Sequence, residues 1–234
     1  MDDTPEPEPA RTLLGLQTMT PRQQLRAGRL PRRLTQLFVG LTVFGLSMAM
    51  LIRGGLGMIP WDVFHYGVAS HVPLTFGTVA IITALVVLLL WIPLREVPGL
   101  GTIANAVWVG VAVDVFLALL SAPDGLLARI GLMVGGIVLN AVATALYIGA
   151  QFGPGPRDGL MTGLARRLPV SMRVIRTAIE VVVVLVGWLL GGVVGIGTVL
   201  FALSIGPLTQ LFLPPLVVRV DPPSSPTPRQ ARGT

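Results

Sequence analysis

The sequence predicts an all-α integral membrane protein with six transmembrane helices, arranged as two inverted three-helix repeats that each contain a short broken or re-entrant helix. Three observations lead to this prediction. Hydrophobic residues make up 53% of the 234-residue chain and charged residues only 12%, a balance typical of membrane proteins. Six apolar windows are each close to the ~20 residues that an α-helix needs to cross the hydrocarbon core. A polar motif also recurs once, at an offset of 96 residues.

The predicted spans follow one another with short connections. They cover residues 34–53, 74–94, 99–121, 130–150, 174–192 and 196–217. The first three spans form repeat 1, residues 34–121, and the last three form repeat 2, residues 130–217. Because each repeat holds an odd number of spans, the second copy enters the membrane from the opposite side. The repeats are therefore predicted to be inverted, an arrangement that recurs in secondary transporters.

The segments outside the repeats are predicted to be cytoplasmic tails. Residues 1–33 begin with an acidic, Pro-rich stretch and end with a basic juxtamembrane segment, while residues 218–234 are rich in Pro and Ser. Neither composition offers enough apolar surface to offset the entropy lost on ordering, so both tails are predicted to be disordered. We expect no cleavable signal peptide, since the N-terminus lacks a basic region followed by a short apolar core.

The arginines predict the orientation of the chain. All 17 basic residues are arginines, and fifteen of them fall on one side of the predicted spans, whereas Arg53 and Arg129 fall on the other. Loops rich in basic residues stay in the cytoplasm, so both termini are predicted to be cytoplasmic in a bacterial inner membrane. The net charge of +6 then reflects topology or binding to anionic lipid headgroups, and we expect no nucleic-acid partner.

The recurring motif indicates a duplication. The stretch GMIPWDVFHYG, residues 57–67, has the same spacing of Gly, Pro and Asp as GPGPRDGLMTG, residues 153–163. The same offset superimposes GLGT at residues 99–102 on GIGT at residues 195–198. The matching positions of the two motifs are Gly57 with Gly153, Pro60 with Pro156, and Asp62 with Asp158.

Each copy of the motif is predicted to start a short helix. Glycine permits non-helical backbone, proline suits the first helical turn, and a carboxylate two residues later is favoured by the helix dipole. The Gly and Pro residues of both motifs are therefore the predicted helix-start elements. The segments that follow are too short to span a bilayer. Asp62 and Asp158 either cap these helices or bind a ligand or proton, and the sequence leaves both alternatives open.

Charged residues inside the predicted spans complete the candidate site. Arg176 and Glu180 lie four residues apart, which places them on one helix face within reach of an ion pair. Asp114 occupies the position that Gln210 holds in repeat 2. A charge at membrane depth costs roughly 2.5–3.5 kcal/mol on the insertion scale, so Glu180 and Asp114 join the motif aspartates as candidate ligand or proton groups. Each also has a structural interpretation, as an ion-pair partner or a bond to a neighbouring helix.

Several kinds of chemistry find no support in the sequence. The chain contains no cysteine, which excludes disulfides and thiolate sites. Its two histidines, His65 and His71, stand outside any metal-binding motif, so we expect no metal and no cofactor. The cluster Trp61, His65 and Tyr66 beside the first motif Asp is interpreted either as an interfacial aromatic belt or as a site wall. No nucleophile, base and orienting group are recognisable together, and we expect no enzymatic activity.

Taken together, these segments resemble the YczE-type branch of the YczE/YitT family of bacterial multi-pass membrane proteins. The resemblance is carried by GMIPWDVFHYG with the following GLGT, by GPGPRDGLMTG, by the RxxxE pair Arg176 and Glu180, and by GGVVGIGT. It covers about residues 38–213. It implies a polytopic inner-membrane protein, and the family carries no settled biochemical activity.

Two functions are compatible with these features. The first is a small secondary transporter or permease with a site between inverted repeats. The alternative is a non-transporting membrane accessory protein that positions or stabilises a partner complex. The expected partners are the lipid bilayer and, according to the function, a small polar solute, another membrane protein or a second copy of the chain. A water-accessible cavity between the repeats that reaches Asp62, Asp158 and Glu180 would favour transport.

Overall fold

The structure is a computed structural model that describes residues 16–17 and 19–220. The regular secondary structure in these residues is helical, and the predicted disorder of residues 1–15, 18 and 221–234 lies outside the described chain. The helices are α1 (Pro21–Arg26), α2 (Leu30–Gly54), α3 (Pro60–Ala69), α4 (Phe76–Leu94), α5 (Leu100–Leu119), α6 (Leu126–Gly149), α7 (Pro156–Ala165), α8 (Met172–Leu189) and α9 (Ile196–Leu216).

Five of these helices, α2, α4, α5, α6 and α9, are long and apolar enough to cross a membrane. Many apolar side chains are exposed along them, which implies contact with lipid. The sixth predicted span, residues 174–192, overlaps α8. This helix carries three charged residues, Arg173, Arg176 and Glu180, within its 18 residues, and for that reason it is not among the five candidate spans.

Four pairs of helices begin 96 residues apart: α2 and α6, α3 and α7, α4 and α8, and α5 and α9. Local sequence explains the shared boundaries. Pro60 and Pro156 occupy the first turns of α3 and α7. The hydroxyls of Thr75 and Ser171 each accept a hydrogen bond from a backbone N–H in the first turn of α4 or α8. Equivalent residues therefore start equivalent helices in both halves of the chain.

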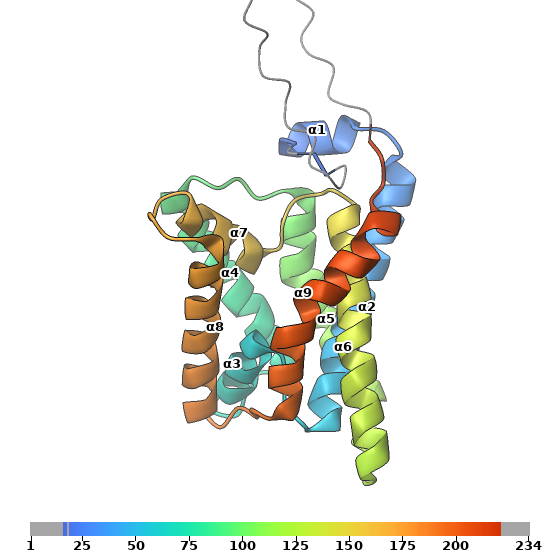
Figure 1. The fold of residues 1–234 in the computed structure, drawn as a ribbon, viewed down its shortest axis with the longest axis vertical. Coiled ribbons are helices and arrows are strands. Elements are labelled where there is room, and N and C mark those ends of the chain that lie inside the picture. Colours follow the sequence, from blue (N-terminus) through green and yellow to red (C-terminus); the bar gives the residue numbers. More distant parts are fainter. Residues whose placement is uncertain (1–15, 18, 221–234) are drawn as a thin grey trace, which may run out of the picture.

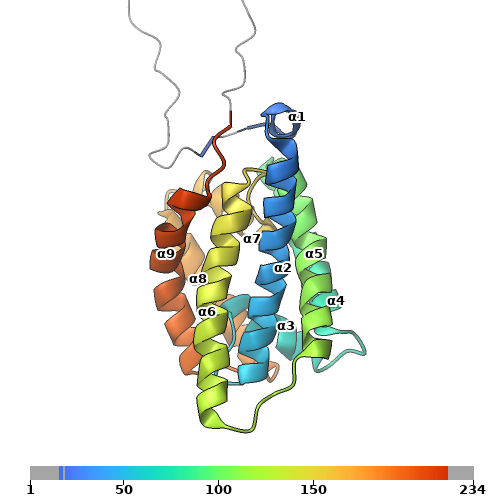
Figure 2. The same cartoon turned by 90° about the vertical axis from the view of Figure 1, so that its right-hand side faces the viewer.

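The long helices form two layers. One is a row in the order α9, α6, α2 and α5, and the other holds α4 and α8 with α3 and α7 beside them (Figures 1 and 2). The row is centred on α2 and α6, which approach closely at Gly40 and Gly136. A buried hydrogen bond of 2.8 Å from Asn140 Nδ2 to Ser47 Oγ also joins these two helices. In Figure 1, α3 lies towards one end of the molecule and α7 towards the other.

The GLGT and GIGT segments hold the two halves together by a reciprocal exchange. The N–H of Gly101 donates to the carbonyl of Phe152 at 2.9 Å, and the N–H of Gly197 donates to the carbonyl of Leu56 at 2.8 Å. Both donors and both acceptors are related by the 96-residue offset. Each segment thus binds the loop that precedes the short helix of the other half. A Cβ on Gly101 would lie 2.9 Å from Phe152, so the approach requires glycine.

Two arginines extend this reciprocity to the ends of α2 and α6. Arg33 Nε donates to the carbonyl of Ala150 at 2.9 Å, and Arg129 Nε donates to the carbonyl of Gly54 at 2.8 Å. Their terminal nitrogens bind the next carbonyl along the chain, at 2.8 and 3.0 Å. Each arginine therefore binds the C-terminal carbonyls of the other half's first helix, where a cation is favoured. Topology alone does not account for these two arginines.

The segments predicted as tails contribute ordered structure where they are described. Residues 19–33 include α1 and the first turn of α2, which begins four residues before the predicted span. Val218 is 1% exposed, and its N–H donates to the carbonyl of Gly149 at 3.0 Å. Met19, Ala27 and Val220 form a small buried cluster. A few apolar residues in a polar stretch are enough to anchor these segments, although their average composition indicates disorder.

Candidate functional site

A cavity of about 340 Å³ lies where α3 and α7 begin. Every helix from α2 to α9 contributes to its wall, so the cavity is built by both halves of the chain. Its volume falls at the lower end of the range of small-molecule pockets. The charged residues of the wall are Arg157, Asp158, Arg176 and Glu180.

The two short helices meet at this cavity. Pro60 and Trp61 of α3 and Pro156 and Arg157 of α7 all line it. The guanidinium of Arg157 lies over the indole ring of Trp61, 5.0 Å from the ring centroid, a cation–π contact between equivalent positions of the two halves. Trp91 Nε1 donates to the carbonyl of Pro156 at 3.0 Å and fixes the start of α7. The starts of the two short helices thus lie close together at the cavity.

Asp158 faces the cavity. Its side chain is exposed there and accepts a hydrogen bond of 2.7 Å from the hydroxyl of Tyr147 on α6. No backbone N–H of the described chain donates to its carboxylate, and the N-cap position of α7 is Gly155, which has no side-chain bond. The hydrogen bonds of the structure therefore give no support to a capping role for Asp158.

Asp62 has a different environment from its counterpart. It is 0% exposed and is not part of the cavity wall, although its neighbours Pro60 and Trp61 are. Its Oδ1 lies 3.4 Å from Nδ1 of His65, which is also fully buried. Neither carboxylate oxygen, neither ring nitrogen of His65 nor Trp61 Nε1 has a hydrogen-bond partner in the described chain. Buried polar atoms are normally paired, so this group departs from the usual pattern.

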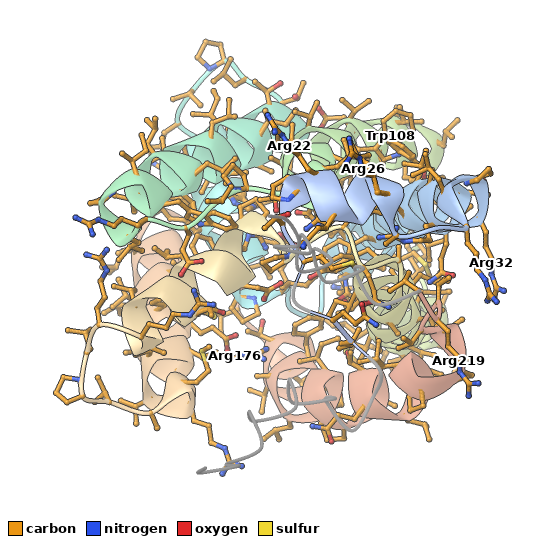
Figure 3. All side chains as sticks on the ribbon, turned by 90° about the horizontal axis from the view of Figure 1, so that it is seen from above. Arg22, Arg26, Arg32, Trp108, Arg176 and Arg219 are labelled. Atoms are coloured by element: carbon orange, nitrogen blue, oxygen red, sulfur yellow. The ribbon has the colours of Figure 1, made fainter. Side chains whose placement is uncertain are left out.

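Arg176 and Glu180 form an ion pair in the cavity wall. The distance from Arg176 Nε to Glu180 Oε1 is 2.8 Å, and the two side chains are 49% and 23% exposed. Figure 3 shows Arg176 on the side of α8 that faces the interior of the molecule. The pair thus faces the cavity, on the opposite side of α8 from the exposed Leu185 and Leu189.

Asp114 lies outside the cavity wall. Its Oδ1 accepts a hydrogen bond of 2.7 Å from the backbone N–H of Gly77, and its Oδ2 accepts one from the hydroxyl of Thr75. These contacts tie the C-terminal half of α5 to the start of α4. Gln210, which occupies the equivalent position of α9, lines the cavity instead. The structural interpretation of Asp114 therefore fits its contacts.

The contact between α4 and α5 has no counterpart between α8 and α9. Gly77 and Gly110 bring the α4 and α5 backbones together, since a Cβ on Gly77 would lie 2.0 Å from the carbonyl oxygen of Gly110. The residues at the equivalent positions of α8 and α9 are Arg173 and Gly206. A Cβ on Gly206 would meet no described atom within 4 Å. Within the described chain, α8 and α9 are therefore not packed as α4 and α5 are.

Comparison with known proteins assigns the family. Residues 31–214 match the model of a family described as "Family of unknown function (DUF6198)". The chain belongs to the DUF6198 family.

Relatives of this DUF6198 protein include proteins of Haemophilus influenzae and Bacillus subtilis. An uncharacterized protein of Haemophilus influenzae is 39% identical over 177 residues, which cover 76% of this chain and 81% of that protein. The uncharacterized membrane protein YczE of Bacillus subtilis is 33% identical over 184 residues, covering 78% and 86%. The uncharacterized protein YyaS of Bacillus subtilis is 28% identical over 183 residues. The YczE-type resemblance is confirmed, and no solved structure matches the chain.

Sequence reasoning missed two members of the site in this DUF6198 protein. The sequence indicates Arg157 only as one of the arginines predicted to be cytoplasmic, and it does not distinguish Tyr147 within an apolar span. Arg157 could have been found from its place inside the predicted broken helix, directly before Asp158. It also occupies the position of repeat 2 that matches Trp61 in repeat 1. The described residues contain no group of three His, Cys, Asp or Glu side chains that could hold a metal ion.

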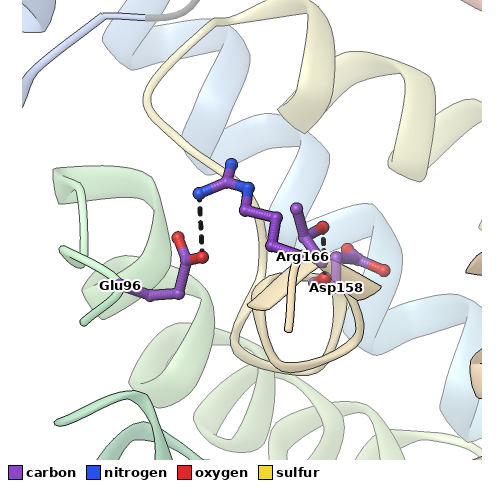
Figure 4. A network of polar contacts seen from close by, with 4 residues as sticks. Glu96, Asp158 and Arg166 are labelled. Carbon is purple, nitrogen blue, oxygen red and sulfur yellow. Dashed lines mark hydrogen bonds and ion pairs between the residues drawn. The ribbon is translucent and has the colours of Figure 1, made fainter. Parts of the chain in front are cut away.

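A second ion pair lies at the far end of α7 from the cavity. Arg166, just after α7, donates from Nη1 to Glu96 Oε1 at 2.9 Å, which links α7 to the connection between α4 and α5 (Figure 4). Neither residue belongs to the cavity wall. This ion pair can therefore serve as a control for substitutions of charged residues in the cavity wall.

Proposed function

We propose that this protein is a small secondary transporter or permease whose solute site is the cavity between its two halves. The observation that carries the proposal is the meeting of α3 and α7 at a cavity lined by Arg157, Asp158, Arg176 and Glu180. Transporters with repeats of this kind place their sites between the repeats, at the starts of discontinuous helices. Charged groups at membrane depth are costly, and their collection around one cavity favours a functional role.

In this proposal α8 is the sixth span and the repeats are inverted in the membrane. Its charged residues Arg176 and Glu180 face the cavity, whereas Val182, Leu185 and Leu189 are exposed on the opposite side and suit contact with lipid. The position of α3 and α7 towards opposite ends of the molecule supports inversion (Figure 1). Both termini then lie in the cytoplasm of a bacterial cell, and the protein lies in the inner membrane.

The wall offers binding by charge and hydrogen bonds, with no catalytic step. Arg157 and Asp158 are the groups that would hold a polar solute, since Arg176 and Glu180 neutralise each other. Asp62 and His65 are the proposed proton-binding pair, because their side chains are in contact, fully buried and without hydrogen-bond partners in the described chain. Movement of one half against the other about the α2–α6 contact would expose the cavity to each side in turn.

Uptake into proteoliposomes tests the proposal. A screen of radiolabelled small solutes should identify at least one that enters faster than into protein-free liposomes. Asp158→Asn should abolish this uptake, and Glu180→Gln should reduce it because Arg176 then lacks its counter-charge in the cavity wall, while both purified variants stay folded and monodisperse. Glu96→Gln is the matched control, because it also removes a paired carboxylate but lies outside the cavity, and it should leave uptake unchanged.

Two results would contradict the transport proposal. One is the absence of uptake for every solute class by a folded, correctly oriented protein. The other is uptake that the site variants and the Glu96 control affect equally. Loss of a membrane complex from cells that lack this protein, without any flux, would instead favour the accessory function.

A further inference from the structure

Arg157 is a cation in the cavity wall with unused hydrogen-bonding capacity. A guanidinium offers five N–H donors, yet in the described chain Arg157 makes no hydrogen bond and no ion pair. Its neighbour is the ring of Trp61, which attracts the positive charge of the guanidinium. This contact does not use the N–H donors as hydrogen bonds. The carboxylates of Asp62 and Asp158 are both close enough to act electrostatically on it. Its donors suit a planar carboxylate, which guanidinium groups bind in bidentate fashion.

The start of α7 supports the same partner independently. This helix of 10 residues begins with Pro156 in the cavity wall and has no side-chain cap. The N–H groups of a first helical turn have no partner within the helix, and the helix dipole favours negative charge there. A solute carboxylate beside Arg157 therefore also lies near these N–H groups.

Asp158 supplies the opposite charge. One of its oxygens accepts the hydrogen bond from Tyr147, and the exposed carboxylate retains further acceptor capacity towards the cavity. The remaining charged residues of the wall, Arg176 and Glu180, are paired with each other. The wall thus holds two cations and two anions, and a solute without net charge leaves this balance unaltered.

We propose that the cavity binds a small zwitterion that carries one carboxylate and one ammonium group, of the size of an amino acid. The carboxylate lies at Arg157 and the start of α7, and the ammonium lies at Asp158 beside the Tyr147 hydroxyl. A volume of about 340 Å³ accommodates a solute of this size. This inference rests on the proposed function, since it names the class of solute that the same cavity would carry.

Binding to the purified protein tests the inference without any transport measurement. Glycine, L-alanine and L-leucine are the zwitterionic probes, and isothermal titration calorimetry together with thermal unfolding in detergent gives their affinities. Propionate and ethylamine are the matched controls, because each keeps only one of the two charged groups. At least one zwitterion should bind about tenfold or more tightly than either control. This difference is expected because each control lacks one of the two charge-assisted contacts. Equal binding of propionate, or no binding of any zwitterion, would overturn the inference.

Substitutions locate the binding within the cavity. Arg157→Gln should weaken binding of the zwitterion by about tenfold or more, and Asp158→Asn should do the same through the ammonium. Arg157→Lys keeps the charge without the bidentate geometry, so it should bind weakly and serves if the Gln variant fails to fold. Arg167→Gln, an exposed change after α7, is the control and should bind as the unaltered protein does. If both Arg157→Lys and Asp158→Asn bound the zwitterion as tightly as the unaltered protein, these two residues would not be its binding groups and the inference would be refuted.

The two proposals fail in different ways. Binding of a zwitterion without flux in proteoliposomes would leave the binding site in place and refute transport. Flux of a solute of another class, in a protein that binds no zwitterion, would support transport and refute the assigned class.

Discussion

The two halves of the chain, α2–α5 and α6–α9, share a framework and differ where they face the cavity. Their helices begin 96 residues apart, and their glycine and arginine contacts are reciprocal. In the cavity wall, however, Ala80 and Ala84 of α4 are replaced in α8 by Arg176 and Glu180. Contacts that join the halves have therefore stayed alike, whereas the charged chemistry of the wall belongs to the second half.

The same divergence accounts for a difference in packing. Gly77 and Asp114 close α4 onto α5, and the equivalent residues of the second half are Arg173 and Gln210. An arginine cannot occupy the space that Gly77 leaves for a neighbouring backbone. The first half thus forms a packed wall, while the second half presents polar groups towards an interior space.

The largest expected effect concerns the two reciprocal arginines. Arg33 is 0% exposed and also donates to the carbonyl of Gln24, whereas Arg129 is partly exposed and binds two carbonyls. Arg33→Ala should lower the free energy of unfolding by about 3 kcal/mol or more, because it leaves buried carbonyls unpaired. Arg129→Ala should cost about 1–2 kcal/mol. Unfolding in SDS–detergent mixtures measures both losses of free energy. Equal losses would show that the greater burial of Arg33 does not make its hydrogen bonds more important for stability.

The next effect separates the packed helix pair from its open counterpart. A Cβ on Gly110 would lie 2.5 Å from the Ile81 side chain and 2.6 Å from the Gly77 carbonyl oxygen. Gly110→Ala should therefore cost about 1–3 kcal/mol by overpacking. Gly206→Ala, in the equivalent position, should be neutral or stabilising by up to about 1 kcal/mol, since alanine favours the helix. The same unfolding assay measures both variants. A loss of unfolding free energy in Gly206→Ala comparable to that in Gly110→Ala would contradict the open arrangement of α9.

A third comparison concerns the two motif aspartates. Asp158→Asn should weaken solute binding, because Asp158 faces the cavity. Asp62→Asn should leave solute binding within about twofold of the unaltered protein, since Asp62 is buried outside the wall, but should remove the dependence of uptake on a proton gradient. Calorimetry and proteoliposome uptake with and without the gradient measure the two effects. Identical behaviour of the two variants would show that they act as one site.

The smallest effect is expected at the ion pair of α8. Arg176 and Glu180 are partly exposed, and such pairs contribute about 0–1 kcal/mol to stability. Arg176→Ala should therefore lower the unfolding free energy by less than about 1 kcal/mol, and the double variant with Glu180→Ala by about the same amount. A single-variant loss that far exceeds the double-variant loss in a double-mutant cycle would show that Glu180 is effectively buried.

The local sequence pattern predicted where helices begin, but it did not predict contacts between residues far apart in the chain. The short helices begin at Pro60 and Pro156 as the motif predicts, because glycine and proline act on the backbone within a few residues. The partners of Asp114 lie 37 and 39 residues away, and no local pattern identifies them. The differing environments of Asp62 and Asp158 likewise arise from neighbouring helices. Identical motifs therefore gave no indication that one carboxylate is buried and the other faces the cavity.

The reciprocal bonds of Gly101 and Gly197 have a consequence for the history of the gene. A chain of half this length would contain one glycine donor and one acceptor loop, and in this structure each donor binds the loop of the other half instead of the loop of its own half. Such a chain could reproduce both bonds as a dimer of two copies. A cut in the connection at residues 120–125, which leaves every such bond between the two fragments, should accordingly yield pieces that assemble when they are coexpressed and are degraded when either is made alone.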